Sequence, residues 1–180
     1  WREHADNPIL TGDDLPWGSN FQTPFVLFDE QERIYKMWFV SVTEIERDEA
    51  GSMTEMTQAL GYATSSDGID WRIHPEPIFE SGRSPSVIKE SPGRYRMWMG
   101  SRPSRQHPPG DLYRNIYEFT STDGVQWERS DQPVLQPTGR ANSTVYPFVL
   151  QENDTYYMWY GCHLDGGTFE IFCATSRDGT

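Results

Sequence analysis

Four short motifs each occur three times along this chain. They are Pro-x-Val, Tyr-x-Met-Trp, Thr-Ser-x-Asp-Gly, and a Trp followed several residues later by Pro-Ile or Pro-Val. The Trp of the second motif recurs at Trp38, Trp98 and Trp159, at nearly constant spacing. A repeat of this kind constrains a chain more than any single residue does, because similar units must pack on one another to bury a shared core.

Each repeat predicts four β-strands. In the first repeat we expect them at 24–28, 34–40, 60–65 and 71–79, where short apolar and aromatic runs are bounded by Gly, Pro, Asp and Ser. No stretch has a sustained helical period with capping residues. Four antiparallel strands in each unit are typical of a propeller blade. We therefore predict an all-β fold, a β-propeller of four-stranded antiparallel blades, in which 1–180 is a single partial propeller with repeats at about 1–70, 71–126 and 127–180.

The residues that the repeats share are expected to be structural. Asp67, Asp123 and Asp178 each precede a glycine, and Asp-Gly pairs form tight turns because Asp bonds nearby backbone groups and Gly tolerates a positive φ. A catalytic group is needed once, not in every blade. For the same reason we expect the repeated Trp residues to pack between blades rather than to bind a ligand.

Three blades are fewer than the roughly four to eight that close a propeller ring. The chain starts at Trp1 without a Met and ends at Thr180, at the same phase of the repeat. These ends predict a fragment of a longer propeller with two open blade faces. The alternative is a ring completed by two copies of the chain. In either case the apolar blade faces favour self-association.

The net charge of −12 and the pI of about 4.6 argue against a nucleic-acid or membrane partner. No transmembrane run or signal segment is in view, and the location stays open, with a secreted or periplasmic one favoured. Cys162 and Cys173 are expected to be free thiols, with a cross-strand bridge as the alternative. With His163 they do not complete a zinc pattern, so no metal site is predicted.

The residues in which the repeats differ are the candidates for ligand binding. In a propeller the first strand of each blade is innermost, so the residues at its beginning and at the end of the second strand should converge around the axis, where a concave pocket can form. Ordinary loop polarity is the alternative for each of them. The candidates are Gln22, Thr23, Arg83, Ser84, Arg102, Asn142, Tyr146 and His163.

Trp17 is the one Trp outside the repeated motifs. We expect it in a loop on the ligand face, as a platform for a sugar ring, or else packed against a neighbouring loop. Arg83 and Arg102 suit pairs of hydroxyls or a sugar carboxylate because the guanidinium presents a fork of donors. The alternative for both arginines is a surface salt bridge.

The motifs resemble those of the five-bladed β-propeller glycoside hydrolases, the superfamily that includes families 32, 43 and 68. The matching segments are Pro85-Ser86-Val87-Ile88-Lys89, Tyr95-Arg96-Met97-Trp98, and Ala63-Thr64-Ser65-Ser66-Asp67-Gly68 with Trp71. The resemblance covers nearly the whole chain and implies about three of five blades. It also implies an oligosaccharide or polysaccharide as the partner and hydrolysis or transfer of a glycosidic bond by two carboxylates.

The chain departs from this family at the positions that matter for catalysis. In members similar to family 43, an Asp and a Glu stand just before the Pro of the first strand in two of the blades. Here Thr23, Ser84 and Tyr146 stand there. Either the catalytic pair belongs to other blades, or other acids serve, or the chain does not catalyse. Within the chain the best candidates for catalytic acids are Asp165, Glu170 and Glu118.

Two further functions remain open. The first is a non-catalytic glycan-binding propeller, which the departure from the carboxylate pattern favours. The second is a six-bladed sialidase-like protein, since Ser-x-Asp-Gly-x-x-Trp is similar to the sialidase Asp box. That box has one more residue between Asp and Gly, and a sialidase needs three arginines, of which only Arg83 and Arg102 are plausible. No cofactor is expected. Some members of the superfamily hold a channel Ca²⁺, which nothing in this sequence requires.

Overall fold

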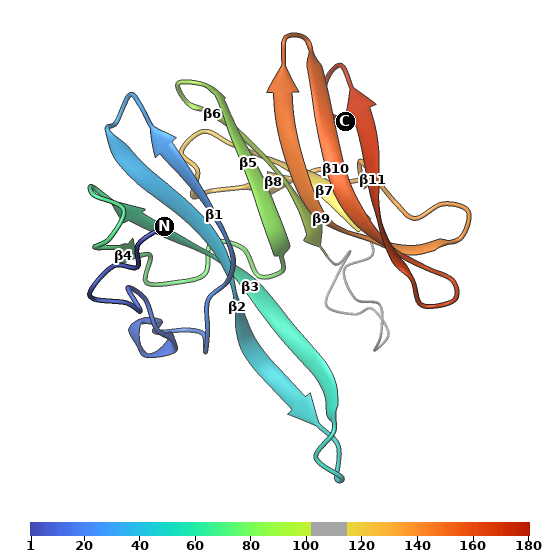
Figure 1. Ribbon diagram of the computed structural model, residues 1–180, viewed down its shortest axis with the longest axis horizontal. Helices are drawn as coiled ribbons and strands as arrows, with labels where there is room; N and C mark the ends of the chain where they lie inside the picture. The colour runs from blue at the N-terminus through green and yellow to red at the C-terminus, as the bar shows by residue number, and fades with distance from the viewer. Residues whose placement is uncertain (102–114) are drawn as a thin grey trace.

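The computed structural model describes residues 1–101 and 115–180, which form three antiparallel sheets lying side by side (Figure 1). Blade 1 consists of β1 (Gln22–Asp29), β2 (Ile34–Arg47), β3 (Met53–Ser65) and β4 (Arg72–Ile73). Blade 2 consists of β5 (Arg83–Ser91), β6 (Arg94–Ser101), β7 (Asn115–Ser121) and β8 (Glu128–Arg129). Blade 3 consists of β9 (Ala141–Glu152), β10 (Thr155–Leu164) and β11 (Phe169–Ser176).

The predicted all-β propeller fold is confirmed. In blades 1 and 2 the strands are hydrogen-bonded in chain order, and blade 3 continues the pattern with three strands. The first strands face one another, since β5 contacts both β1 and β9, so these strands are innermost. In the described residues the one helical element is a short 3-10 turn at Gly12–Asp14. None of the described helices has the length and apolar character needed to cross a membrane.

Three predicted strand lengths were wrong. The second and third strands of blade 1 extend beyond 34–40 and 60–65, and together they form an arm that projects from the molecule (Figure 1). The sequence did not predict this extension because the added stretches lack aromatic residues, and the residues at 43–47 and 53–54, toward the end of the arm, are exposed. The fourth strand, expected at 71–79, is only Arg72–Ile73 plus a bridge between Leu60 and Phe79. Prolines in this segment cannot donate to a ladder, which keeps the edge short.

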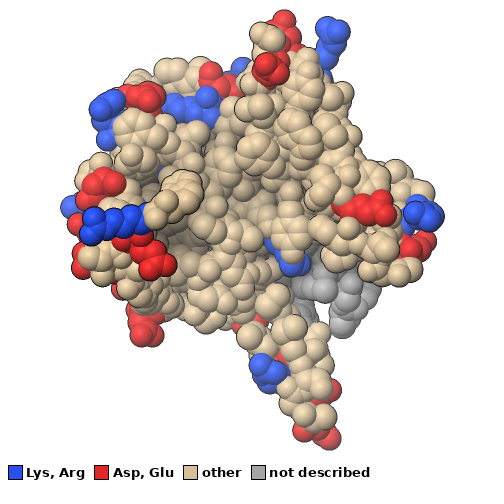
Figure 2. Space-filling model, viewed as in Figure 1, with Lys and Arg blue, Asp and Glu red and all other residues tan. Residues whose placement is uncertain are grey.

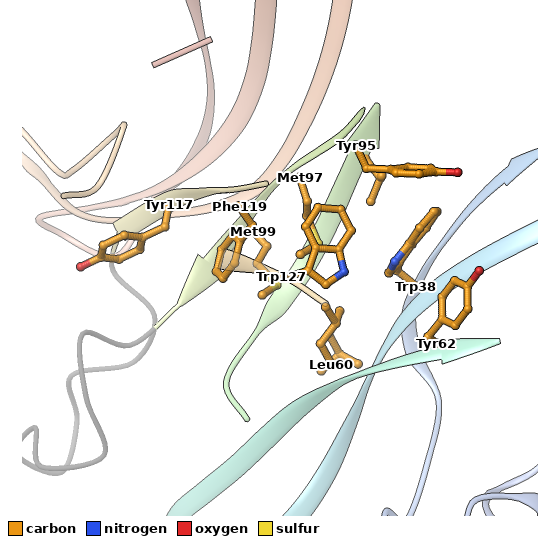
Figure 3. Packing of buried hydrophobic residues seen from close by; sticks show 11 residues of the cluster. Trp38, Leu60, Tyr62, Tyr95, Met97, Met99, Tyr117, Phe119 and Trp127 are labelled. Carbon is orange, nitrogen blue, oxygen red and sulfur yellow. The ribbon is translucent and has the colours of Figure 1, made fainter. Parts of the chain in front are cut away.

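A cluster of buried side chains fills the interface between blades 1 and 2 (Figure 3). The Trp38 ring contacts those of Tyr62, Tyr95 and Trp127, and its indole donates to the carbonyl of Gly124 at 2.8 Å. Trp98 repeats this contact with Gly179 of blade 3 at 2.9 Å. The repeated Trp and Asp-Gly motifs therefore join each blade to the next, which confirms their structural role. The blade 1 and 2 residues labelled in Figure 3 are Trp38, Leu60, Tyr62, Tyr95, Met97, Met99, Tyr117, Phe119 and Trp127.

The repeated Asp residues stabilise the turns. The carboxylate of Asp67 accepts hydrogen bonds from the backbone N–H groups of Ile69 and Asp70 at 2.8 and 2.9 Å, and Asp123 accepts the same pair in blade 2. The Ser176 hydroxyl and the backbone of Thr180 lower the pKa of Asp178 to about 2. The carboxylates of Asp67, Asp123 and Asp178 therefore accept hydrogen bonds within their own turns.

A buried polar network also repeats between blades, and the motif analysis did not predict it. Asp29 accepts hydrogen bonds from Lys89 and from the Tyr95 hydroxyl of blade 2 at 2.7 Å and lies 3.1 Å from the ammonium of Lys36. At the next interface Glu90 and Arg96 of blade 2 meet the Tyr156 hydroxyl of blade 3 in the same way. Each network therefore consists of an acidic residue near the end of the first strand, a basic residue directly before Met-Trp, and the Tyr of the same motif in the following blade.

The prediction of two open blade faces is half wrong. The outer face of blade 1 is covered by the N-terminal segment, whose Leu10, Leu15, Trp17 and Phe21 pack on Met37, Phe39 and Ala63. The outer face of blade 3 is open and exposes Phe148, Trp159 and Ile171. The cysteines are free, because in the β10–β11 register Cys162 is opposite Glu170 and Cys173 is opposite Trp159.

Candidate functional site

The innermost strands share an unusual backbone feature where they begin. Thr23, Ser84 and Tyr146 each precede the Pro of Pro-x-Val, and each has a left-handed φ, of 44°, 56° and 55°. The strand register shifts beside all three, which marks a bulge. A left-handed φ costs a residue other than glycine about 1–3 kcal/mol, and such strain concentrates at functional sites. Bulges re-aim side chains, and in this chain they do so at the same axial position in every blade.

Arg83 and Tyr146 connect the beginnings of β5 and β9. The guanidinium of Arg83 donates to the Tyr146 hydroxyl at 2.8 Å, and its Cζ lies 5.2 Å from the centre of the Tyr146 ring. Among the described residues, no carboxylate is within salt-bridge distance of Arg83. Arg83 therefore forms no salt bridge in the described part of the chain, and its positive charge lies beside the Tyr146 ring.

Buried polar atoms without a partner lie on the innermost strands or beside them. Gln58 is 2% exposed and donates to the side-chain oxygen of Gln22 at 2.8 Å, while its own side-chain oxygen accepts nothing in the described structure. The hydroxyls of Ser84 and Ser143 are also buried and without a partner there. A buried polar group left unpaired costs about 1–3 kcal/mol. Unmet hydrogen-bonding capacity of this kind is what a hydroxyl-rich ligand can use.

Blade 3 adds an aromatic cluster to this end. The ring of His163 lies 4.7 Å from that of Phe169, and Tyr146 meets Phe169 edge to face at 6.1 Å. His163 is opposite Ser143 in the β9–β10 register. Asn142 is exposed at the start of β9. The structure therefore brings Arg83, Tyr146 and His163 together through shared contacts. Gln58, Ser143 and Phe169 belong to the same end and were missed because they fall outside the repeated motifs.

The three candidate acids do not form a pair. Glu118 lies opposite Trp98 in the middle of β7, and its carboxylate is 2.5 Å from the guanidinium of Arg96. Asp165 and Glu170 are exposed in the hairpin between β10 and β11, where Glu170 is opposite Cys162. Glu118 also lines a cavity of about 610 Å³ between the outer parts of blades 2 and 3, which contains none of the candidate binding residues.

Trp17 lies on the outer face of blade 1. Its ring stacks on Phe39, with centroids 6.0 Å apart and an angle of 11° between the planes, and its indole donates to the carbonyl of His74 at 3.3 Å. Trp17 therefore packs against neighbouring segments of the chain, which was the alternative to a sugar platform. Arg102 falls outside the described residues. Within residues 1–101 and 115–180, no cluster of three or more His, Cys, Asp or Glu side chains is arranged to hold a metal ion.

No protein-family profile matches the chain. Two uncharacterised proteins from strains of Mycobacterium tuberculosis are each 35% identical to it over 96 residues, which is 53% of this chain and 31% of each relative. The chain thus matches less than a third of the length of these relatives.

Solved structures extend the comparison to nearly the whole chain. A glycoside hydrolase superposes on 97% of this chain and 52% of its own, with a TM-score of 0.73 and 19% identity. A family 130 protein, described as belonging to mannoside phosphorylases and hydrolases of β-1,2-mannosidic linkages in Candida mannan, covers 99% and 56%, with a TM-score of 0.66 and 18% identity. A family 32 β-fructofuranosidase of Bombyx mori covers 89% and 34%, with a TM-score of 0.67 and 11% identity. The chain has the fold of the five-bladed β-propeller glycoside hydrolases and spans about half the length of the first two of these structures.

Proposed function

We propose that this chain is part of a carbohydrate-active, glycosidase-like protein that binds a glycan where β1, β5 and β9 begin. The observation that carries the proposal is the left-handed residue before Pro in every blade, with the buried, unpaired Ser84 hydroxyl among them. Strain that recurs at one axial position, together with unmet hydrogen-bonding capacity, is the pattern expected of a binding site.

The side chains at this end have complementary roles in the proposed site. Arg83 donates to neighbouring sugar hydroxyls, and its contact with Tyr146 fixes the guanidinium plane. The Gln22–Gln58 pair and the serines exchange hydrogen bonds with further hydroxyls. The rings of Tyr146, His163 and Phe169 pack on the C–H face of a sugar ring. Asn142 and Thr23 contribute polar contacts at the rim.

A non-catalytic binding role is the second candidate, because Thr23, Ser84 and Tyr146 cannot act as the carboxylate pair. Glu118 is held by Arg96 inside the sheet, which argues against a role as a proton donor. If the chain's own acids catalyse, Asp165 and Glu170 are the accessible ones. The similar solved structures include proteins named for mannosidic, xylosidic and fructofuranosidic chemistry, so the fold does not select a sugar.

The test combines binding and turnover. Oligosaccharides of several classes are titrated into the protein by calorimetry, and the same set together with aryl glycosides is assayed for released sugar. We expect saturable binding that Arg83→Ala weakens at least tenfold, while Arg33→Ala, at an exposed hairpin, leaves it unchanged. Binding with turnover supports a hydrolase, and binding without turnover supports the non-catalytic role. Binding that is insensitive to Arg83→Ala would place the glycan elsewhere.

A further inference from the structure

Arg83 differs from the cations that are buried between the blades. Lys36, Lys89 and Arg96 each lie within ion-pair distance of a carboxylate. Arg83 has intermediate exposure at the beginning of β5 and contacts no carboxylate of residues 1–101 or 115–180. A cation that is partly withdrawn from water is normally stabilised by a counterion. The positive charge of Arg83 is therefore unmatched in the described structure.

Arg83 belongs to the central blade, away from both ends of the chain. β5 is the innermost strand of blade 2 and contacts the innermost strands of both neighbouring blades, β1 and β9. At its beginning β5 pairs with the end of β6, where Arg83 is opposite Gly100. The neighbours of β5 on both sides are therefore part of the described structure, and Arg83 lies at the axial end where the candidate residues of all three blades are found.

Tyr146 of blade 3 orients the guanidinium without neutralising it. Nη2 of Arg83 donates to the Tyr146 hydroxyl at 2.8 Å, and Cζ lies 5.2 Å from the centre of the ring. A guanidinium has N–H donors on each of its nitrogens in one plane, and among the described residues only Nη2 donates to a side chain. The other donors can bind a pair of hydroxyls or a carboxylate, but only the carboxylate also matches the charge.

Uncharged polar groups accompany Arg83 on the same strand and on the neighbouring one. Ser84, the next residue of β5, is 7% exposed, and Ser143 of β9 is 8% exposed. Neither hydroxyl has a hydrogen-bond partner in the part of the chain that the structure describes. A hydroxyl both donates and accepts, so it can bind a carboxylate oxygen or a sugar hydroxyl. One cation with neutral hydroxyls suits a ligand that combines a single negative charge with many hydroxyls.

The acidic residues of the chain lie mainly at its margins. In the view of Figure 2, acidic groups are found around the outline of the molecule and on the β2–β3 arm, whereas the hollowed surface between the blades is mostly uncharged. At physiological ionic strength an exposed charge acts over only about 8 Å. The net charge of −12 therefore opposes an anionic ligand near the axis only weakly.

We propose that the site selects an acidic glycan, one whose bound sugar carries a carboxylate as a hexuronic acid does, and this rests on the function proposed above. Arg83 binds the carboxylate through the donors that Tyr146 leaves free. The unpaired hydroxyls of Ser84 and Ser143 bind the other oxygens of the sugar. A sulfate ester is the competing anion, and it is separated from a carboxylate by experiment.

The first experiment compares glycans that differ only in this group. Oligosaccharides of galacturonic, glucuronic and mannuronic acid are titrated into the protein by calorimetry, each beside its methyl ester, which has nearly the same shape but no charge. We expect at least one acid to bind about tenfold or more tightly than its ester, because charge-assisted hydrogen bonds are stronger than neutral ones. The preference should shrink as NaCl is added, since salt screens a partly exposed charge pair.

Variants test whether Arg83 causes the preference. Arg83→Gln keeps a hydrogen-bonding side chain without the charge, so the acid should bind about tenfold to hundredfold more weakly and the ester within about threefold of its original affinity. Arg83→Lys keeps the charge but not the fork and should fall in between. The matched control is Arg140→Gln, at an exposed arginine just before β9 that also contacts no carboxylate in the described ranges. It removes the same charge and should change the affinity for the acid by less than about twofold.

Tyr146→Phe provides a second, milder change, because it keeps the ring and removes the hydroxyl that accepts from Nη2. It should weaken binding of the acid about threefold and leave binding of the ester unchanged. Circular dichroism shows whether each variant is folded.

The outcomes separate this proposal from the glycan site itself. Acid and ester that bind equally tightly, with an affinity that Arg83→Gln lowers for both, overturn the selection of an acidic sugar and leave the glycan site standing. Tighter binding of a sulfated oligosaccharide than of any hexuronide, or an equal loss in Arg140→Gln and Arg83→Gln, also overturns it. A protein that binds none of the acidic, esterified, sulfated or neutral glycans refutes the proposed function as well.

Discussion

Replacement of Asp29 by Asn should destabilise the fold by about 3 kcal/mol, the lower end of the range for breaking a buried ion pair. Asp29 is 1% exposed and accepts hydrogen bonds at 2.7 Å from both Lys89 and the Tyr95 hydroxyl. The amide keeps the shape of the side chain but removes the charge that balances two ammonium groups. The cost stays at the lower end because Lys36 retains Glu32 at 2.8 Å and Lys89 is 14% exposed.

Urea unfolding followed by tryptophan fluorescence measures this change. With a slope of about 2 kcal/mol per molar, the loss lowers the unfolding midpoint by about 1.5 M. The control is Glu30→Gln, one residue further on, whose contact with Arg33 joins side chains that are 80% and 75% exposed. An exposed pair contributes about 0.5 kcal/mol or less, so the control should barely move. Equal effects of the two substitutions would refute the view that the interblade network stabilises the fold.

The remaining predictions concern pH, strain and the tryptophan contacts. Burial alone raises the pKa of Asp29, but hydrogen bonds from Lys89 and Tyr95 outweigh it and leave that pKa well below its usual range. The stability that this carboxylate supplies is therefore complete above about pH 4 and is lost as the pH falls further. The stabilities of Asp29→Asn and of the unmodified protein should therefore converge in acid. Ser84→Gly removes a backbone strain of about 1–2 kcal/mol, while the added entropy of the unfolded chain costs about 0.4–1 kcal/mol. We therefore expect slightly higher stability with weaker glycan binding. The control Arg33→Gly, at a residue with a φ of 56°, should gain stability without affecting binding. Trp98→Phe leaves the Gly179 carbonyl without its donor and should lower the free energy of unfolding in urea by about 1–3 kcal/mol. Trp159→Phe should cost less than Trp98→Phe because Trp159 is partly exposed.

The repeated motifs determined the architecture because each carries its own local physics. Asp67 and Gly68 form a turn through local hydrogen bonds, and the continuous apolar run Met97-Trp98-Met99 of β6 makes a strand that must be covered on both faces. The recurrence then requires equivalent packing, so the buried positions of Trp38 and Trp98 followed from the sequence alone. So did the axial location of Thr23, Ser84 and Tyr146, because the first strand of a blade is innermost.

Only the tertiary structure decided how residues from different blades meet. The Asp29 network joins side chains about sixty residues apart in sequence, and nothing local distinguishes a buried acid at a strand end from an exposed one. The left-handed φ of Ser84 arises from a bulge between neighbouring strands, which a pattern of residue types does not record. The covered face of blade 1 likewise depends on where the N-terminal segment packs, because Leu10, Leu15 and Trp17 reach Met37 and Phe39 only in the folded chain.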